Sequence, residues 1–454
     1  MKKVKNINPL VTVYITNHNY GNYINKAIKS VLVQSLKNFE LIIIDDGSKD
    51  DSKKIINKYK NNKKIIPIFQ NNRGLTVSNN VALRLSRGKY IMRLDADDWL
   101  DSHALEILSD KLEKNPKVGL VFPDYFEVDE TGQIIELVRR HDFNKVKLLD
   151  QPAHGACSMI RKECLNRLGG YNEDFSCQDG YYIWIKIIEK FEIANVNLPL
   201  FYYRQHKSSL SKNEERILKT RSEIIKRSIE HKKNTNKKAL AIIPVRGPQI
   251  NPKSIVLKKL RKKPLICWTI DNLLKTKRIV KILVSSPDKT ILNFLKKKYK
   301  KQVLILRRKS NLGGINVELD KTLIHAIDYA KKKKINFDYV FQLSFRTPFL
   351  KSYDLENFLN IIELFNTDEV IGVRSERNIF YQHDGIGLKS ISKSSILKLE
   401  RDEVYRGIGG LRLFQKDKFY NKKSRRKKIG HVILDQKSSH EINSDLDWKI
   451  AQII

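Results

Sequence analysis

Residues 90–99 read YIMRLDADDW, and this stretch gives the strongest indication of the fold. Its apolar start is typical of a buried strand, and three carboxylates, Asp95, Asp97 and Asp98, follow where that strand would end. Open α/β sheets bind ligands at the carboxyl ends of their strands. Carboxylates one residue apart can hold a hard divalent cation through oxygen. The alternative is an Asp-rich turn that caps the helix beginning near Asp101.

The sequence before this stretch alternates between strand-like and helix-like patterns. Residues 11–15, 39–44 and 65–69 are apolar and rich in β-branched side chains, and apolar residues recur at helical spacing between them. Ser48 or Asp50 is expected to cap the helix after the second strand. Together with the strand before Asp95, this rhythm predicts a mainly parallel sheet with helices on both faces.

Residues 8 to about 210 resemble a family 2 glycosyltransferase of the GT-A fold. The segments that carry the resemblance follow the family's order and are residues 11–20, 42–48, 72–80 with 87–90, 94–99, the Gly-Gly-Tyr-Asn-Glu turn at 169–173, residues 177–184 and the Tyr-Arg-x-His-x-x-Ser element at 203–211. Two positions depart from the pattern. Gln178 stands where the family usually has Glu, and Asn79 stands where Arg is usual.

The resemblance implies a role for each matched position. Asp179 would be the general base that deprotonates the acceptor hydroxyl in an inverting transfer. A Mg²⁺ or Mn²⁺ ion would be held by Asp95, Asp97 and His206. The residues in contact with the donor nucleotide would be Thr16, Asn19, Asp45, Asp46, Asn80, Asp95 and Arg204. His206 and Arg204 could instead be an ordinary loop histidine and a surface arginine.

The character of the sequence changes near residue 212. Residues 214–231 have apolar side chains at rough helical spacing, and residues 231–238 are polar and charged, which is typical of a linker. A second α/β rhythm begins with a strand at 239–244 and includes an expected helix at 319–332. It ends in a C-terminal helix for which Ser444 is the expected N-cap.

Residues 239–454 resemble the acylneuraminate-type cytidylyltransferases, which activate acidic sugars as CMP derivatives. The matching segments are residues 242–247, 252–255 with 263–266, 284–288, 342–348 and 441–447. The resemblance implies that Arg246, Lys253, Gln342 and Glu441 contact a nucleotide. The expected fold class is therefore α/β, with two Rossmann-like, nucleotide-sugar-binding domains in tandem: a GT-A glycosyltransferase domain at 1–211, a helix and basic linker at 212–238, and a cytidylyltransferase-like domain at 239–454.

Several positions of the second domain depart from the cytidylyltransferase pattern. The phosphate-binding loop after Arg246 is shorter, and Pro248 removes one backbone N–H donor from it. Asn443 stands where the family has a metal-binding Asp, which lowers the negative charge available to a hard cation. Residues 346–347 and 408–410 also differ. We therefore interpret this domain as a non-catalytic binding or docking module rather than a CTP-dependent enzyme.

The composition limits the partners and the compartment. Lys and Arg number 87 against 50 Asp and Glu, a net charge of +37. These basic residues are spread along the chain without interleaved aromatics, so nucleic acid is not an expected partner. Solvated basic faces are the simpler explanation, and contact with anionic lipid headgroups is the alternative. Four unpatterned cysteines, no signal peptide and no long apolar run predict a cytoplasmic protein, or one peripheral at the inner face of the membrane.

Three functions of different classes follow from these patterns. The leading one is a metal-dependent inverting glycosyltransferase that uses a UDP-sugar and a glycan or lipid-linked acceptor in surface polysaccharide synthesis, fused to a domain without catalysis. The second is a bifunctional enzyme that also makes a CMP-activated acidic sugar from CTP. The third is a basic binding protein without catalysis, and the retained carboxylates argue against it.

Overall fold

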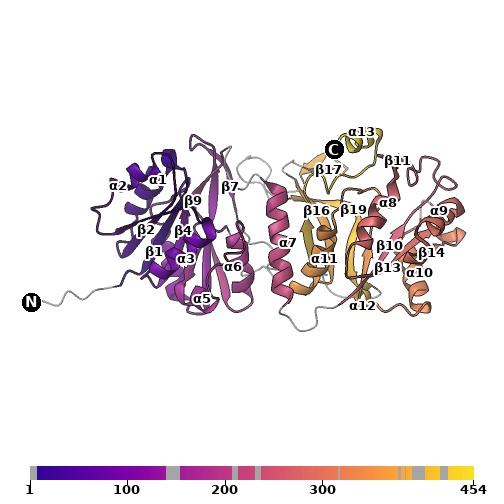
Figure 1. Ribbon diagram of the computed structural model, residues 1–454, viewed down its shortest axis with the longest axis horizontal. Coiled ribbons are helices and arrows are strands. Elements are labelled where there is room, and N and C mark those ends of the chain that lie inside the picture. Colours follow the sequence, from indigo (N-terminus) through magenta and orange to yellow (C-terminus); the bar gives the residue numbers. More distant parts are fainter. Residues whose placement is uncertain are drawn as a thin grey trace, which may run out of the picture. The chain divides into compact units, whose positions relative to one another are not determined.

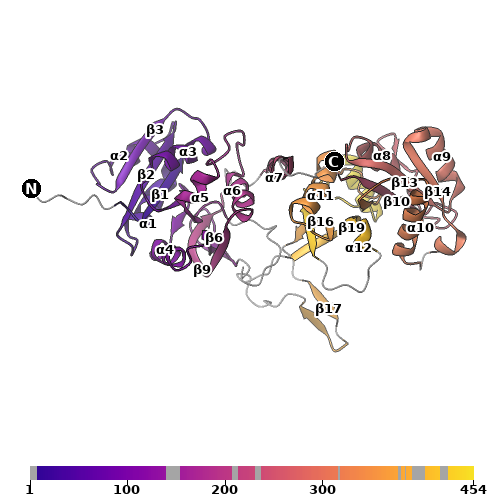
Figure 2. The same ribbon diagram turned by 90° about the horizontal axis from the view of Figure 1, so that it is seen from below.

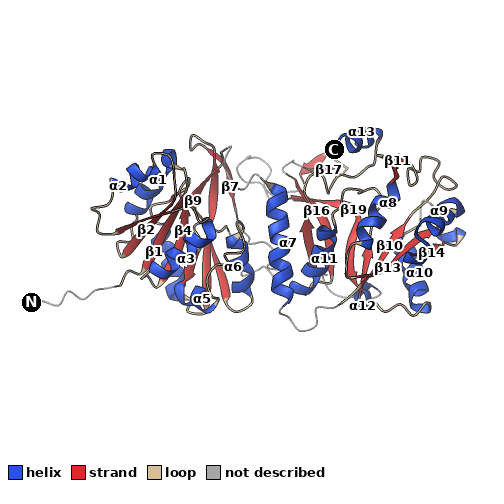
Figure 3. Ribbon diagram, in the orientation of Figure 1, coloured by secondary structure: helices blue, strands red, loops and turns tan. Residues whose placement is uncertain are grey.

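The structure, a computed structural model, describes residues 8–139, 154–206, 213–230, 237–314, 317–376, 380–383, 385–390, 404–419 and 428–454. The chain divides into two compact units, residues 1–221 with 378–402 and residues 222–377 with 403–454. Figures 1 and 3 show that each unit is built on its own β-sheet with helices packed against it. Residues 207–211 of the Tyr-Arg-x-His element and 231–236 of the expected linker lie outside the described residues. The domain boundaries stay a prediction.

The first unit is built on a nine-stranded mixed sheet with the strand order β3-β2-β1-β4-β8-β6-β9-β5, and β7 pairs with β6. Its strands are β1 (Val11–Asn17), β2 (Phe39–Asp46), β3 (Ile65–Gln70), β4 (Tyr90–Asp95), β5 (Trp99–Leu100), β6 (Val118–Val128), β7 (Ile134–Val138), β8 (Met159–Arg161) and β9 (Glu192–Arg204). Strands β3, β2, β1 and β4 run parallel as predicted. Beyond β4 the sheet is mixed, because β8 runs antiparallel to both β4 and β6. The prediction of a mainly parallel sheet is therefore correct for the first four strands, and β6 also runs parallel to β9, whereas β5, β7 and β8 pair antiparallel with their neighbours.

Helices cover both faces of this sheet (Figures 1 and 2). They are α1 (Gly21–Leu32), α2 (Ser52–Asn57), α3 (Leu75–Leu85), α4 (Ala104–Lys114), α5 (Lys162–Arg167) and α6 (Asp179–Ile188), and α7 (Glu214–Glu230) follows. One face forms a core with α1, α2 and α4, in which Ile28 and Leu108 pack against side chains such as Val13, Leu41 and Met92. These strand residues alternate in sequence, so the next residues along each strand face α3 on the other side.

One expected helix cap is wrong. The residue before α2 is Asp51, and neither Ser48 nor Asp50 occupies the cap position. The Asp50 carboxylate instead accepts hydrogen bonds from the backbone N–H of Gly21 at 2.8 Å and of Ser52 at 3.0 Å. Asp50 therefore joins the first turns of α1 and α2 beside the carboxyl ends of β1 and β2.

The second unit is built on a seven-stranded sheet with the order β14-β13-β10-β15-β19-β16-β20. Its strands are β10 (Ala239–Pro244), β13 (Ile279–Ser286), β14 (Val303–Arg307), β15 (Tyr339–Gln342), β16 (Glu369–Glu376), β19 (Val404–Gln415) and β20 (Ile429–Ile433), and β11 (Lys259–Leu260) forms a separate pair with β12 (Lys263–Pro264). A further two-stranded pair, β17 (Tyr381–His383) with β18 (Leu388–Ser390), belongs to the first unit. Strand β19 runs antiparallel to both β15 and β16. This reversal was not predicted, because β19 lies far along the chain from β15.

The helices of the second unit also lie on both sheet faces. They are α8 (Leu265–Leu274), α9 (Lys289–Tyr299), α10 (Leu319–Lys332), α11 (Ser352–Leu364), α12 (Lys416–Phe419) and α13 (Asp445–Ile453). Helix α10 packs Leu323 and Ile327 against Ile242 and Val340 in the core. The prediction of α10 is correct residue for residue. The predicted cap of α13 is also confirmed, because the Ser444 side chain accepts a hydrogen bond from Asp447 N–H.

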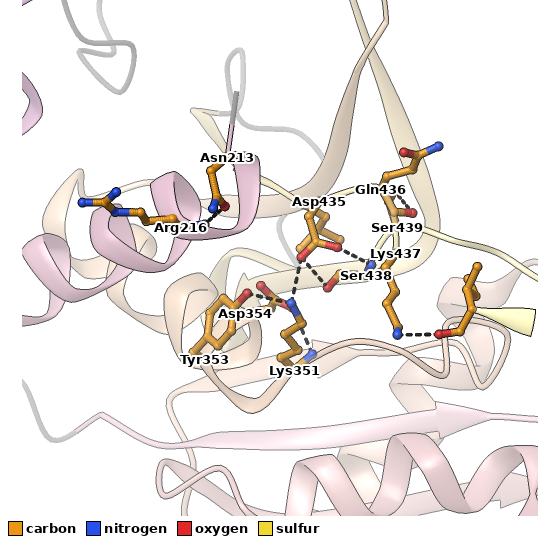
Figure 4. A network of polar contacts seen from close by, with 12 residues as sticks. Asn213, Arg216, Lys351, Tyr353, Asp354, Asp435, Gln436, Lys437, Ser438 and Ser439 are labelled. Atoms are coloured by element: carbon orange, nitrogen blue, oxygen red, sulfur yellow. Dashed lines mark hydrogen bonds and ion pairs between the residues drawn. The ribbon is translucent and has the colours of Figure 1, made fainter. Parts of the chain in front are cut away.

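A polar network fixes the start of α11 in this unit (Figure 4). Lys351 Nζ lies 3.2 Å from both the Asp435 carboxylate and the Tyr353 hydroxyl. The backbone N–H of Lys351 donates to Asp354, and Ser438 donates to Asp435 through both its N–H and its hydroxyl. Burial raises the pKa of the Asp354 carboxyl to about 6. Every polar group of this network has a partner within the protein, so its role is structural.

Candidate active site

The candidate active site of the first unit lies where β1, β2 and β4 end. In the sheet register, Thr16 pairs with Asp95 and Asn17 pairs with Asp45. The acidic residues after β4 are then held in a tight turn, because Asp98 N–H donates to the Asp95 carbonyl at 3.1 Å. The next two residues form β5, which pairs with β9. The carboxylates predicted from the sequence therefore do lie at the carboxyl edge of the sheet.

The three carboxylates of this turn destabilise one another. Burial, and then the charges of Asp97 and Asp95, raise the pKa of the Asp98 carboxyl well above its usual range. Burial also raises the pKa of Asp95 to about 6, although the Arg93 guanidinium opposes this shift and Asp97 adds to it. The Asp98 Oδ2 atom is buried without a hydrogen-bond partner among the described residues. A bound cation would relieve this repulsion, so the turn fits one.

The acidic turn offers few protein ligands, which suits a cation that is also bound by a substrate phosphate. Within the described part of the chain, no three His, Cys, Asp or Glu side chains form a group that could hold a metal ion by themselves. Mg²⁺ is usually bound by one or two carboxylates together with water and substrate phosphates, rather than by a cage of protein ligands. Asp97 and His206 lie together, with His206 Nε2 at 2.8 Å from Asp97 Oδ2. The identity of the ligands stays a prediction.

A buried arginine joins the acidic turn to the predicted base. Arg93 Nε lies 2.9 Å from Asp95 Oδ1, and Arg93 Nη1 pairs with Asp179 Oδ2. The same Asp179 oxygen accepts a hydrogen bond from Asn79 Nδ2 at 2.8 Å. Burial lowers the pKa of the Arg93 guanidinium, but the charges of Asp179 and Asp95 outweigh this effect and raise it overall. Arg93 therefore stays charged and sets where the Asp179 carboxylate lies.

Two glycines leave room for this arginine. A Cβ atom on Gly155 would lie 2.9 Å from Arg93 Nη2 and 3.4 Å from the Cα of Gly180. A Cβ atom on Gly180 would lie 2.7 Å from the Cα of Gly155. The two backbone segments can therefore close over the guanidinium only because neither residue has a side chain.

Asp179 is the first residue of α6, and the residue before it has a strained backbone. Gln178 has φ 62° and ψ 29°, the left-handed region. This conformation costs a residue with a Cβ atom roughly 1–2 kcal/mol of free energy. Strain of this kind persists only where the surrounding structure fixes it, and it occurs often at functional sites. This turn directs Asp179 toward β4 and Arg93.

Arg204 is a buried packing residue. Its guanidinium lies 4.8 Å from the ring centroids of both Tyr23 and Trp99. Its Nε donates to the Asp97 carbonyl at 2.9 Å, and its backbone N–H donates to Asp98 Oδ1 at 2.8 Å. Two further bonds run from Nη1 to the carbonyls of residues 129 and 130. The structure therefore makes Arg204 a support of the acidic turn, and a direct contact with the donor stays a prediction.

His206 lies among aromatic rings beside the acidic turn. The Tyr23 ring stacks on it at 5.4 Å between centroids, and the Tyr20 ring meets it edge-on at 5.6 Å. Burial, and then the charges of Asp97 and Asp95, raise the pKa of the Tyr20 hydroxyl. His206 lies in the loop after β9 and is almost fully buried, and its role at a metal stays a prediction.

The remaining predicted donor contacts fall into two groups. Asp45 accepts a hydrogen bond from Asn17 Nδ2 at 2.8 Å, and Asn19 bonds with the next loop through Ser48 and Lys49. This group lies at the sheet edge next to Thr16. It also includes Asn17, which the sequence reasoning missed although it directly follows Thr16.

Asp46 and Asn80 belong to the second group, in which the polar atoms are engaged by the protein. Asp46 accepts hydrogen bonds from Gln70 Nε2 and from the N–H groups of Arg73 and Gly74. Asn80 bonds with both backbone groups of Tyr171 and with the Glu173 side chain. These contacts fix the turns around residues 70–74 and 169–173, and donor contacts at the two positions stay predictions.

Arg93 is the functional residue that sequence reasoning missed. It lies inside the apolar run before Asp95. A charged residue between apolar residues of a buried strand is a signal for a buried ion pair. Its second partner, Asp179, is 86 residues away, so the pairing could not be read from spacing. Asn79 was noted only as a departure from a family pattern, and in the structure it contacts Asp179.

The second unit carries basic residues at the carboxyl edge of its sheet. Arg246 follows β10 and donates to the carbonyls of Gly313 and Gly314 at 3.2 and 2.7 Å. Arg308 follows β14, is almost fully buried, and its acceptors among the described residues are neutral oxygens of Val245 and Ser285. Burial and the charge of Arg246 lower the pKa of the Arg308 guanidinium to about 10. An anion bound here would relieve this unfavourable electrostatics.

The other predicted residues of the second unit lie around two glycines. Gly409 N–H donates to Glu441 Oε2 at 3.2 Å, and a Cβ atom on Gly410 would lie 3.8 Å from Gln342 Nε2. Gln342 Oε1 is buried without a hydrogen-bond partner among the described residues. Lys253 is exposed. The structure thus places Glu441 beside Gly409 and Gln342 beside Gly410, while a common site of these residues with Arg246 stays a prediction.

Comparison with known proteins supports the assignment of the first unit. The family described as "Glycosyl transferase family 2" matches residues 12–169. The chain is 31% identical over 225 residues to the Escherichia coli UDP-Glc:alpha-D-GlcNAc-diphosphoundecaprenol beta-1,3-glucosyltransferase WfaP, covering 48% of this chain and 86% of that protein.

Larger relatives and solved structures are also similar. The chain is 31% identical over 191 residues to the chondroitin synthase of Escherichia coli, which is 42% of this chain and 28% of that protein. The chain thus spans about a quarter of the length of the chondroitin synthases that it matches. The structure of residues 1–349 of S. aureus TarS with UDP-GlcNAc has a TM-score of 0.42 and 16% identity, covering 49% of this chain and 66% of that one. Given the match to WfaP over most of that protein's length and the family match across the acidic turn, this chain belongs to glycosyl transferase family 2, and its first unit is a glycosyltransferase domain.

Proposed function

We propose that the first unit catalyses metal-dependent, inverting transfer of a sugar from a nucleotide-sugar to a hydroxyl group of a glycan or lipid-linked acceptor. This proposal rests on the buried Arg93, which pairs with the carboxylates of both Asp95 and Asp179. One carboxylate belongs to the acidic turn that fits a cation. The other lies at the start of a helix, where it can accept a proton.

The carboxylates lie in different surroundings, and we assign them different roles in the transfer. Asp179 would remove the proton of the acceptor hydroxyl, with its carboxylate held in place by Arg93 and Asn79. Asp95 and Asp97 would hold a Mg²⁺ or Mn²⁺ ion, with His206 beside Asp97. That ion would supply positive charge to the leaving diphosphate. Asn17, Asn19 and Asp45 offer hydrogen-bonding groups at the same sheet edge for the nucleoside.

The relatives support a UDP-sugar and a lipid-linked acceptor. WfaP is named for the transfer of glucose from UDP-glucose to a diphosphoundecaprenol-linked sugar, and this chain matches 86% of its length. No helix in the described ranges is long and apolar enough to cross a membrane. A net charge of +37 would favour peripheral contact with anionic lipids that carry such an acceptor. We therefore propose a role in surface polysaccharide synthesis at the inner face of the membrane.

For the second unit we propose anion or nucleotide binding without catalysis. Arg308 is buried beside another arginine, and the acceptors that it meets in the described part of the chain are neutral oxygens. A phosphate group would supply the missing negative charge. The shortened loop at Pro248 and the presence of Asn443 argue against transfer chemistry. A bifunctional enzyme that makes a CMP-linked acidic sugar is the alternative, and a protein without any catalysis is the third reading.

We expect Asp97→Asn to reduce the rate of transfer by at least about 10²-fold, the usual effect of losing one group that stabilises charge in the transition state. The amide is a weaker ligand and cannot offset charge on the diphosphate. The measurement is release of UDP from UDP-glucose and UDP-N-acetylglucosamine by the full chain with Mn²⁺. The control is Asp110→Asn, which makes the same change at an exposed side chain of α4. Turnover by Asp97→Asn within a few-fold of wild type would refute the metal assignment.

We expect Asp179→Asn to lower turnover by about 10²–10⁴-fold, the usual contribution of a general base. Binding of UDP, measured by calorimetry with Mn²⁺, should change far less than turnover. Asp174→Asn, an exposed residue five positions earlier, is the control for the loss of charge. A variant that loses UDP binding in step with turnover would make Asp179 a binding residue instead of the base.

We expect the full chain to bind CTP or CMP at the second unit and to release no pyrophosphate from CTP in the presence of nonulosonic or ulosonic acids. Arg308→Met should weaken binding about tenfold or more, since a hydrogen bond to a charged group contributes roughly 1.5–3 kcal/mol. Arg307→Met is the matched control, because Arg307 is the exposed neighbour. Metal-dependent pyrophosphate release would favour the bifunctional enzyme, and equal affinities for both variants would remove Arg308 from the site.

A further inference from the structure

We propose that the first half of helix α7, which lies after the segment that matches the glycosyltransferase family, is part of the active site because it holds the loop that carries Asp179. Arg221 is the main positioning residue in this arrangement. The proposal rests on the proposed function of Asp179. Its physical part, the fixing of the loop by the helix, can be measured without any activity.

Helix α7 contacts three consecutive residues of the loop before Asp179. Arg216 Nη2 donates to Ser176 Oγ at 2.9 Å, and Cys177 Sγ lies 3.3 Å from Thr220 Oγ1. Arg221 Nε donates to Gln178 Oε1 at 2.6 Å. Among the described residues, no other side-chain hydrogen bond reaches these three loop residues, so α7 is their principal side-chain support.

The spacing places two of these residues on one face of the helix, because Arg216 and Thr220 are four residues apart. Arg221 points about 100° away from Thr220 and reaches the loop through its long side chain. The start of the helix is itself fixed, because Asn213 Oδ1 accepts a hydrogen bond from Arg216 N–H at 3.0 Å (Figure 4). The first turn is therefore capped at the point where it meets Ser176.

Arg221 acts on the strained residue of the loop. Its guanidinium lies 5.1 Å from the centroid of the Tyr181 ring, in the first turn of α6, and it bonds to the side chain of Gln178. One side chain thus contacts the residue before Asp179 and the residue two positions after it. Gln178 keeps a left-handed backbone that side chains rarely adopt. Without this support the turn can relax, and the carboxylate of Asp179 can move away from Arg93.

The glutamine itself fits this role. A Gln side chain gives the arginine a charge-assisted hydrogen bond without adding a further negative charge beside Asp179. The carboxylate of a Glu at this position would bind Arg221 more strongly, but its charge would lie next to the base. The residue at which this chain departs from the family pattern, Gln178, is therefore bonded to an arginine of α7.

The test compares Arg221→Ala with Arg227→Ala in the full chain. Arg227 lies on the same helix and pairs at its surface with Glu223, so it is the matched control. Amide hydrogen exchange of residues 176–181 should become several-fold faster in Arg221→Ala and stay unchanged in Arg227→Ala. Turnover of UDP-sugars should fall by about ten- to a hundredfold, as expected when a reacting group is misplaced, while UDP affinity with Mn²⁺ stays within a few-fold. Arg221→Lys, which keeps one donor for Gln178, should recover part of the turnover.

A second variant separates the side-chain contact from backbone strain. Gln178→Gly removes the contact and leaves a residue that adopts the left-handed region freely. If Arg221 acts through Gln178, the effects of Arg221→Ala and Gln178→Gly on exchange should be strongly non-additive in the double variant. Unchanged exchange of 176–181 in Arg221→Ala would overturn the proposal. Loss of turnover in Asp179→Asn with normal turnover in Arg221→Ala would overturn it too, while turnover that survives Asp179→Asn would refute the proposed base instead.

Discussion

The ion pairs of Arg93 are the interaction on which the active site depends. A buried guanidinium needs negative partners, because leaving it unpaired in a low-dielectric interior is costly. The chain supplies them from two places far apart in sequence, the end of β4 and the start of α6. The pairing therefore brings the acidic turn and the predicted base into one site. Gly155 and Gly180 allow the backbone to close over the arginine, and Asn79 completes the hydrogen bonding of Asp179.

Several polar residues around Arg93 and its two carboxylate partners form hydrogen bonds with other parts of the protein. Arg204 lies between aromatic rings and bonds to the acidic turn. Asp46 and Asn80 fix neighbouring turns through backbone groups. The candidate site is thus a small set of carboxylates held by a larger set of polar residues that are already hydrogen-bonded. Such preorganisation is how enzymes place charge without paying for reorganisation during the reaction.

Much of the fold could be predicted from local sequence, and the reasons are specific. Strand β2 is buried along its whole length, and its apolar residues 41–44 mark it in the sequence as a strand. Helix α10 has a regular apolar stripe, and its bounds agree with the prediction. The antiparallel strands β8 and β19 were missed, since their partners are distant in the chain and their sequences lack a strong period. The same limit applies to the site. Aspartates beside one strand could be found from spacing, whereas Arg93–Asp179 and Arg221–Gln178 depend on how separate elements meet.

The proposed transfer requires a divalent cation at the acidic turn while Arg93 holds the base nearby. The most direct measurement is anomalous X-ray diffraction from crystals of the full chain grown with UDP and Mn²⁺. We expect one Mn²⁺ peak in contact with the Asp97 carboxylate and with diphosphate oxygens, while Asp179 remains paired with Arg93. A UDP molecule bound without Mn²⁺ at Asp97, or an Asp179 side chain turned away from the donor site, would contradict this account.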